Sequence, residues 1–221
     1  MRHFCLTVSG VASIELPLAP PHQEARLIDA TLACMSRWGV AKTTLDDVAR
    51  RAGCSRATVY RVFPGGKESL LEATVRSEVA RFLGKEAAAL EACDELDDIL
   101  VTGMVTAGRH LAEHEVLQCL LAHEPEVVLP LVAFTRMDAV YAVVRDFFAP
   151  YLAPHVGHAE APRAAEWVAR LTLSYTLCPS DAFDVCDEES VRRLVRCYVL
   201  PGLAHPVSAL PVSAPASITK G

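Results

Sequence analysis

The sequence predicts an all-α protein, and three observations support that fold class. Apolar residues recur at helical spacing through most of the chain, no segment alternates convincingly with a period of two, and proline and glycine residues separate stretches of helical length. The chain of 221 residues suffices for one large domain or two small ones, and its hydrophobic content of 52% can fill a substantial core. We therefore expect helices throughout and no sheet.

The first predicted element after the N-terminus is a helix that starts near Ala25 and runs to about Gly39. Residues 1–21 precede it, end in Pro20-Pro21 and are expected to form a flexible extension. Their apolar start is followed by Glu15 without a small-residue cleavage site, so we do not interpret it as a signal peptide.

A short helix, a tight turn and a second short helix are predicted next, over residues 44–63. Thr44 is a good N-cap, and Asp47 three residues later resembles the second member of a capping box. Gly53 is expected to end the first helix in a left-handed conformation, and Ser55 to cap the second. Apolar residues recur on the inner side of both helices: Leu45, Val48, Ala49, Cys54, Val59 and Phe63.

The outer side of the second short helix carries residues that suit a nucleic-acid surface. An arginine can pair with guanine or hold a phosphate, and hydroxyl groups can donate to phosphate oxygens. The residues left outside are Arg56, Thr58, Tyr60 and Arg61. An ordinary helical hairpin with a solvated charged face is the alternative, but the caps, the turn glycine and the buried residues together favour a helix-turn-helix that enters the major groove of DNA.

Charge is distributed unevenly along the chain. The net charge is −6, but residues 22–67 contain eight Lys and Arg against four Asp and Glu, a balance of +4, so the remainder carries −10. A basic head on an acidic body would orient the protein on DNA.

Residues 23–75 resemble the DNA-binding part of TetR-type regulators. The resemblance lies in Ala25 to Gly39, in Thr43-Thr44, in the helix-turn-helix with Tyr60-Arg61-Val62-Phe63, and in Lys67-Glu68-Ser69-Leu70-Leu71. It implies a homodimeric repressor with an N-terminal three-helix helix-turn-helix DNA-binding domain and a larger C-terminal helical domain for ligand binding and dimerisation. The DNA-binding residues that it implies are Thr43, Thr44, Ser55, Arg56, Ala57, Thr58, Tyr60, Arg61 and Lys67.

Two positions depart from the family pattern. Val62 stands where the family often has histidine or another polar residue, and Pro64-Gly65-Gly66 is one residue longer than the common loop.

The expected organisation is a flexible extension over 1–21, the DNA-binding domain over 22–68, the effector-binding and dimerisation domain over 69–201, and a disordered tail over 202–221.

The remaining helices follow from apolar periodicity and breakers. A connecting helix runs from Glu68 to about Leu90 with one face marked by Leu71, Val75, Val79 and Phe82, and an acidic loop follows. Later helices are expected over 99–111, 116–123, 126–148, 163–177 and 188–200, with Pro150, Pro154 and Gly157 in a loop and Pro201-Gly202 as the end of the last helix. Gly103 and Gly108 weaken their helix, so close approach of a ligand or a neighbouring helix is expected there.

The last two helices carry more apolar surface than the exterior of a monomer needs. In the resembled family such helices pair into a four-helix dimer interface, which would present two recognition helices about 34–36 Å apart to a palindromic operator. The expected interface residues are Trp167, Leu171, Tyr175, Val191, Leu194, Val195 and Tyr198. The alternative is that they form intramolecular core.

Methionine and aromatic residues of the body suggest a pocket for a small hydrophobic effector. The expected lining is Met104, Phe134, Met137, Tyr141, Phe147, Phe148, Trp167 and Tyr175. Ordinary core is the alternative for each residue. The leading interpretation is a ligand-responsive repressor.

A second interpretation keeps DNA binding but makes thiol chemistry at Cys178, Cys186 or Cys197 the trigger. The family context favours a cytoplasmic location with reduced thiols, and Cys34, Cys54 and Cys119 are expected to be small buried hydrophobes.

Other classes of function are disfavoured. His110 and His114 have a spacing that can hold a metal, with His123 nearby, but no further ligands close the set, so no metal and no cofactor are expected. A helical enzyme with a DNA-binding head is the remaining alternative, and the chain lacks a phosphate loop and a nucleophile elbow. No apolar run reaches 18 residues, so no membrane span is expected.

Overall fold

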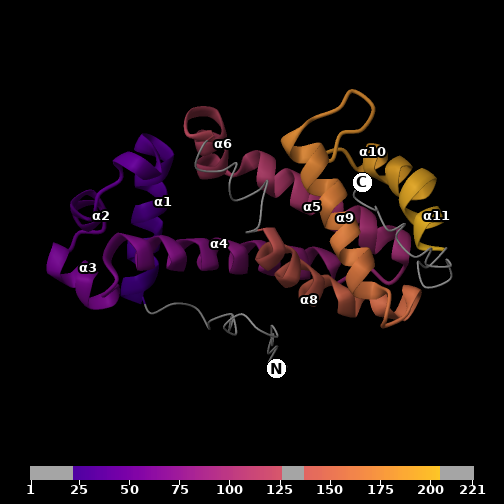
Figure 1. Cartoon of the computed structure of the whole chain (residues 1–221), viewed down its shortest axis with the longest axis horizontal. Helices are drawn as coiled ribbons and strands as arrows, with labels where there is room; N and C mark the ends of the chain where they lie inside the picture. Colours follow the sequence, from indigo (N-terminus) through magenta and orange to yellow (C-terminus); the bar gives the residue numbers. More distant parts are fainter. Residues whose placement is uncertain (1–21, 126–136, 205–221) are drawn as a thin grey trace, which may run out of the picture.

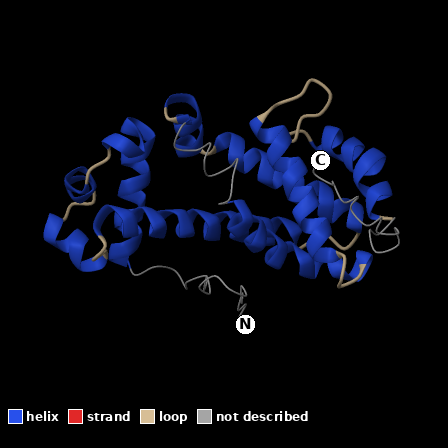
Figure 2. Cartoon of the chain, in the orientation of Figure 1, coloured by secondary structure: helices blue, strands red, loops and turns tan. Residues whose placement is uncertain are grey.

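The computed structural model describes residues 22–125 and 137–204, apart from the side chains of Met137 and Ala139. Within these ranges the protein is helical, and the β-type pairing consists of one isolated bridge between Ser180 and Phe183. The predicted all-α class is confirmed (Figure 2). The expected extension over 1–21, residues 205–221 of the expected tail, the first part of the expected helix over 126–148, and Phe134 lie outside the described residues.

Three helices and the start of a fourth form the N-terminal head (Figure 1). They are α1 (His22–Lys42), α2 (Leu45–Arg51), α3 (Arg56–Val62) and α4 (Gly66–Leu90). Their core contains Leu27, Val48, Val59 and Phe63, as the inner faces of the two short helices predicted. Cys34 is fully buried in this core, whereas Cys54 packs against it only half-buried.

Helix α4 connects the head to the body and belongs to both cores. Leu70 packs in the head, and Leu83 and Leu90 pack in the body. The predicted apolar face is interrupted between them, because Val75 is exposed where α4 spans from one core to the other (Figure 1). Arg81 of α4 pairs with Asp29 of α1 at 2.6 Å and ties the connecting helix back to the head.

The body consists of the helices that follow α4. They are α5 (Leu96–Glu113), α6 (Glu115–His123), α8 (Met137–Val156), α9 (Ala161–Leu177), α10 (Glu188–Leu194), the π-helical η1 (Val195–Val199) and α11 (Leu200–Leu203). Helices α8 and α9 pack against each other, and α5 contacts α4, α9 and α10. A Cβ at Gly108 would lie 2.6 Å from the Val185 carbonyl oxygen, so the predicted close approach at this glycine is made by the chain itself.

Two helices extend through prolines that were expected to end them. Helix α8 continues through Pro150 and Pro154 to Val156, and it ends at Gly157, whose φ is +87°. The loss of backbone hydrogen bonds is outweighed by burial of side chains such as Leu152, which is 2% exposed. The last helix likewise passes Pro201 to Leu203, after a π-helical turn in which the Leu200 N–H bonds to the Val195 carbonyl.

Candidate DNA-binding surface and ligand pocket

The caps predicted for α2 and α3 are confirmed. The Thr44 hydroxyl oxygen accepts the Asp47 N–H at 3.2 Å, and the Ser55 hydroxyl oxygen accepts the Thr58 N–H at 3.2 Å. Gly53 has φ +65°, as the left-handed end of α2 requires. Arg26 of α1 donates to the Ala52 carbonyl and holds the turn from behind. These local contacts fix the angle at which α3 leaves the head.

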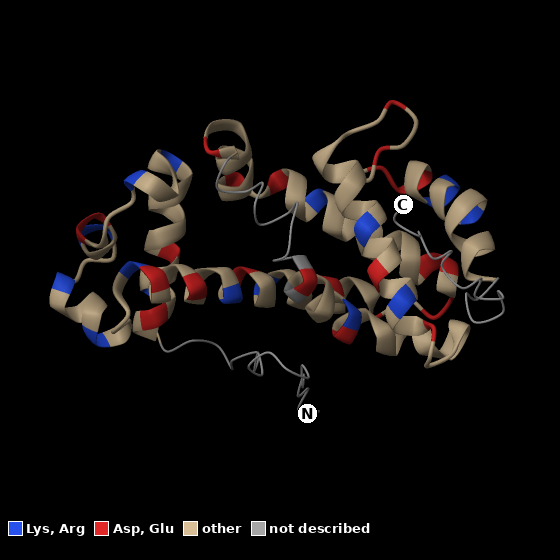
Figure 3. Ribbon diagram, viewed as in Figure 1, with Lys and Arg blue, Asp and Glu red and all other residues tan. Residues whose placement is uncertain are grey.

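The outer side of α3 is exposed, as predicted. Ser55, Arg56, Ala57, Tyr60 and Arg61 are exposed, and Thr58 is half-buried with its hydroxyl 3.0 Å from that of Ser55. Figure 3 shows basic residues on the outer end of the head, near acidic residues of α2, and residues of both signs along α4 and the body. This outer end is where the charge distribution predicts a phosphate-facing surface.

Arg56 is held in a defined position before any DNA is bound. Its guanidinium donates to Asp46 Oδ2 of α2 at 2.8 Å and to the Tyr60 hydroxyl at 3.3 Å. The Tyr60 ring in turn lies over Gly66, where a Cβ would be 3.4 Å from the ring. Hydrogen bonding to Tyr60 and the charge of Asp46 raise the pKa of Arg56, so the side chain keeps its charge.

Two of the residues implied as DNA contacts, Thr43 and Lys67, donate to backbone carbonyls of α1. Thr43 is buried, and its hydroxyl donates to the Gly39 carbonyl at 2.6 Å, so this side chain is not presented to DNA. The physical reason is the kink at Gly39, which leaves a carbonyl that Thr43 satisfies. Lys67 is half-buried and donates from Nζ to the Val40 carbonyl at 2.7 Å, where it caps the end of α1.

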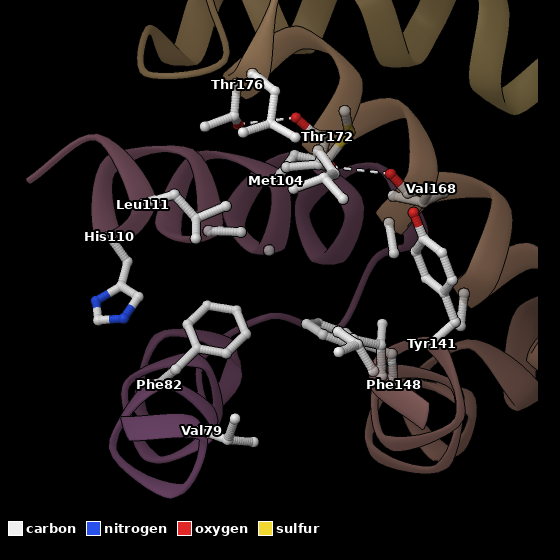
Figure 4. Close-up of a pocket in the computed structure, with 18 of the residues that line it drawn as sticks. Val79, Phe82, Met104, His110, Leu111, Tyr141, Phe148, Val168, Thr172 and Thr176 are labelled. Carbon is white, nitrogen blue, oxygen red and sulfur yellow. Dashed lines mark hydrogen bonds between the residues drawn. The ribbon is translucent and has the colours of Figure 1, made fainter. Parts of the chain in front are cut away.

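A cavity of about 350 Å³ lies in the body between α4, α5, α6, α8 and α9 (Figure 4). Val79 and Phe82 of α4, Met104 and Leu111 of α5, Tyr141 and Phe148 of α8, and Val168 of α9 point into it. Its size is within the range of small-molecule sites, and its wall is almost entirely apolar.

The pocket residues predicted from the sequence divide into three groups. Met104, Tyr141 and Phe148 line the cavity. Trp167 and Tyr175 do not line it: Trp167 packs on Gly202 of α11, and Tyr175 meets Phe183 edge-to-face with ring centroids 5.8 Å apart. Both contact residues that follow α9 in the chain, which helical periodicity alone does not reveal. Phe134 and the side chain of Met137 are outside the described part of the chain, and Phe147 lies in the core.

Lining residues from α4 and α6 were not predicted. Val79 and Phe82 appeared only as one face of the connecting helix, and Leu117 and Leu121 had no assigned role. Gly103 also lines the cavity, where a Cβ would lie 3.2 Å from Phe148 Cε1. The glycine itself was the one sequence signal of a close approach at this place.

The polar groups around the cavity are mostly engaged with neighbours. The hydroxyls of Thr172 and Thr176 donate to the carbonyls of Val168 and Thr172 within α9. Arg170 lies over the Tyr141 ring, 4.1 Å from its centre. His110 stacks on Phe82 at 5.2 Å, and its pKa is lowered by burial first and by the charge of Lys85 next.

Helix α6 joins this cavity to the head. Leu117 and Leu121 border the cavity, while Val116 and Leu120 pack on Met35 of α1. At its start, His114 Nδ1 accepts the Leu117 N–H at 3.2 Å and its Nε2 lies 2.9 Å from Glu78 of α4. That contact lowers the pKa of Glu78.

The end of α6 reaches the kink in α1. Glu124 Oε2 accepts the Val40 N–H at 2.8 Å, directly beside Gly39, whose φ is +79°. A Cβ at Gly39 would overlap the Glu124 carboxylate, so the glycine makes room for this contact. Helix α6 is therefore bound to α1 by this hydrogen bond as well as by apolar packing.

The expected dimer residues are partly interior. Val191, Leu194 and Val195 are 1%, 3% and 0% exposed and pack within the core of their own chain, so the expectation that they face a partner is corrected. Arg192 on the same helix pairs with Asp98 of α5 at 2.9 Å, which turns the apolar side of α10 inward. Leu171 and Tyr175 are half-buried against the core, whereas Trp167 and Tyr198 are 38% and 61% exposed.

The cysteines and histidines of the other interpretations have ordinary neighbours. Cys178 and Cys197 are exposed, Cys119 is half-buried, and burial raises the pKa of the half-buried Cys186. The cysteines in the described ranges are all unpaired. His123 contacts the Cys119 carbonyl at 3.0 Å, and no group of three or more potential metal ligands occurs among the residues described. None of the described helices is long and apolar enough to cross a membrane.

Residues 27–74 match the family model described as bacterial regulatory proteins, tetR family. The chain is 27% identical over 187 residues to an uncharacterized HTH-type transcriptional regulator of Mycobacterium tuberculosis (strain CDC 1551 / Oshkosh), covering 83% of this chain and 86% of that one. It is 50% identical over 54 residues to the HTH-type transcriptional regulator BetI of Paraburkholderia xenovorans, which covers 24% of this chain and only 27% of BetI.

Solved structures share the fold over most of the chain. The TetR family repressor AlkX of Dietzia sp. matches with a TM-score of 0.59 and 18% identity, covering 80% of this chain and 95% of AlkX. A SmeT–triclosan complex matches with a TM-score of 0.54 and 24% identity, covering 88% of this chain and all of SmeT. Residues 27–74 are thus a DNA-binding domain of the TetR type, and the chain as a whole is similar to HTH-type transcriptional regulators.

Proposed function

We propose that this regulator is a repressor that leaves a palindromic operator when a small hydrophobic molecule enters the cavity of the body. The observation that carries the proposal is the apolar cavity of about 350 Å³, whose wall includes α6, the helix that also holds α1. The single chain thus contains a surface for DNA, a space for a ligand and a physical connection between them.

The chemistry of the cavity supports a hydrophobic effector. Its lining is aliphatic and aromatic, and its threonine hydroxyls donate within their own helix. SmeT is described in complex with triclosan, and AlkX is described as implicated in biodegradation of n-alkanes, which are apolar compounds of comparable character. We propose a ligand of this general class for the present chain.

The apolar face of α6 supports a mechanism of release. A ligand that widens the cavity pushes on Leu117 and Leu121, which share this face with Leu120 and pack beside it in the cluster that holds Met35 of the head. Packed interfaces favour discrete arrangements, so the head would shift as a unit relative to the body. The ligand then favours the population whose heads no longer match the operator spacing.

Dimerisation supports the use of a palindrome. The exposed aromatic residues Trp167 and Tyr198 lie on the outer side of α9 and η1 and provide apolar area for a twofold contact. Two copies would then present α3 to half-sites about one helical turn apart, roughly 34–36 Å.

The test begins with selection of bound genomic fragments by the purified protein, followed by titration of the selected fragment at low ionic strength. Thermal-shift screening of fatty acyl compounds, aromatics and drugs then identifies ligands, and their addition should release the DNA. A folded protein that retards no fragment would refute the DNA-binding role. Ligands that stabilise the protein but leave the complex with DNA intact would refute the release mechanism.

A further inference from the structure

We propose that the effector is an amphipathic cation, whose protonated amine pairs with the carboxylate of Glu86 beside Gly103 while its apolar part fills the cavity. The inference rests on the proposed function, because it assigns the class of ligand to the same pocket. It follows from the position of a buried carboxyl group, from its lack of partners and from the charges around the cavity.

Glu86 lies in the interior of the body, behind the lining of the cavity and next to its lining residue Gly103. The residue is 0% exposed and projects from α4, one turn after Phe82, which lines the cavity. A Cβ on Gly103 would be 3.8 Å from Glu86 Oε2, and Gly103 and Phe148 both line the cavity. The missing side chain at Gly103 therefore leaves the carboxyl group next to the space where a ligand would lie.

Neither carboxyl oxygen of Glu86 has a hydrogen-bond partner. Burial raises its pKa to about 8, so the group is mostly protonated at neutral pH in the empty protein. An unpartnered buried carboxyl group destabilises a fold, and such groups call for a specific explanation. A ligand that supplies the missing partner is that explanation.

The charges around the cavity favour a cation as this partner. No Lys or Arg is among the residues found to line the cavity, whereas Glu78 does so two turns before Glu86 on α4. Arg170 and Lys85 lie behind the lining, over Tyr141 and beside His110, and do not themselves line the cavity, so an anionic ligand would find no Lys or Arg in its wall. An ammonium group beside Gly103 would also lie near the Phe148 ring, whose face attracts cations.

Binding of an amine should be linked to loss of a proton from Glu86. The carboxylate form pairs with the ammonium group, so affinity rises about tenfold per pH unit below pH 8 and levels off above it. Three other titratable groups lie near this site: Tyr151 of α8, Glu78 of α4 and His110 of α5. The pKa of Tyr151 is raised by burial first and by the charge of Glu86 next. His110 also titrates in acid, and it is retained in the variants used below.

The experiment measures calorimetric binding of three decyl probes to the full-length protein: n-decylamine, 1-decanol and decanoate. At pH 8, decylamine should bind about 10- to 100-fold more tightly than decanol, as a charge-assisted hydrogen bond predicts, and decanoate should bind most weakly. At pH 7, titrations in two buffers of different ionisation enthalpy should show release of about 0.9 proton per amine and none per decanol.

Two matched variants locate the effect. Glu86→Gln keeps the shape of the side chain but cannot ionise, so the preference for the amine and the proton release should both disappear while decanol still binds. Glu78→Gln removes a carboxylate that already has partners in His114 and Arg81, and the preference should remain. Both variants can be checked for folding by the decanol titration itself.

The outcomes separate the inference from the proposed function. If decanol and decylamine bind equally to the wild type, or if Glu86→Gln keeps the preference for the amine, the cationic ligand is refuted and the hydrophobic pocket stands. Tightest binding of decanoate refutes it as well. If none of the three probes binds the wild-type protein, the effector pocket itself is refuted.

Discussion

Replacing Glu86 by glutamine should stabilise the protein, and the gain should grow with pH. The wild-type carboxyl group is buried without a partner, and burial raises its pKa from 4.5 to about 8. Between these values the unfolded chain has lost the proton and the folded chain still holds it. Because the folded state binds more protons, the free energy of unfolding falls as pH rises through this window.

The magnitude follows from the size of the pKa shift. Each pH unit inside the window costs about 1.4 kcal/mol of stability, so the Glu86 carboxyl group costs about 3 kcal/mol at pH 7 and about 5 kcal/mol above pH 8. Below pH 4.5 the contribution vanishes, since both states are protonated there. Glutamine has no such titration, so the difference in stability between variant and wild type should widen by about 2 to 3 kcal/mol from pH 6 to pH 8.

Chemical denaturation at fixed protein concentration, followed by circular dichroism at pH 6, 7 and 8, measures this difference. Glu166→Gln is a suitable control, because its carboxylate pairs with Arg145 at 2.6 Å and its pKa is lowered, so it should show no change in this pH range. Taking differences cancels the histidines, which all three proteins share. A gap between Glu86→Gln and wild type that stays constant from pH 6 to pH 8 would contradict the assignment of Glu86 as a neutral buried acid.

Three further predictions concern DNA, coupling and assembly. Arg56→Ala should weaken specific DNA binding by about 1 to 3 kcal/mol, and Lys67→Ala should weaken binding to all DNA sequences about equally and lower the slope of log affinity against log salt concentration by about one. Gel retardation measures both affinities. If neither variant changes the affinity for DNA, the docking of α3 into the major groove is contradicted. Leu120→Ala should lower the free energy of unfolding by roughly 2 to 5 kcal/mol. The variant should still bind the ligand, but the ligand should no longer release DNA. Full release of DNA by the ligand would argue against α6 as the connection between cavity and head. Tyr198→Glu should shift the sedimentation mass from dimer to monomer, and an unchanged dimer would remove η1 from the interface.

The helix-turn-helix could be predicted because its signals are local. The caps Thr44 and Ser55 act on amides three residues away, and the φ of Gly53 depends on its own lack of a side chain. The exposed side of α3 follows from the same short-range periodicity. Thr43 was the exception, because its hydroxyl bonds to a carbonyl freed by the kink at Gly39, which the resemblance did not show.

The ends of the later helices were harder to predict, since distant packing outweighs local signals there. Pro150 and Pro154 lie inside α8 because side chains such as Leu152 are buried against other parts of the body. Val191 was expected at a dimer interface from its apolar helix and from the family resemblance, but it packs in the core of its own chain and is 1% exposed. A period of 3.6 identifies an apolar face without saying what covers it.

The sequence by itself determined the helical class, the helix-turn-helix and the resemblance of residues 23–75 to TetR-type regulators, because each depends on residues close together in the chain. Only the tertiary structure decided which side chains surround the cavity, that α6 links it to α1, and that Glu86 lies unpaired beside Gly103. These features require five helices to converge, and the environment of a buried carboxyl group is set by its neighbours in space. Gly103 marked the place in the sequence, but its meaning came from Phe148 and Glu86, the neighbours that folding brings to it.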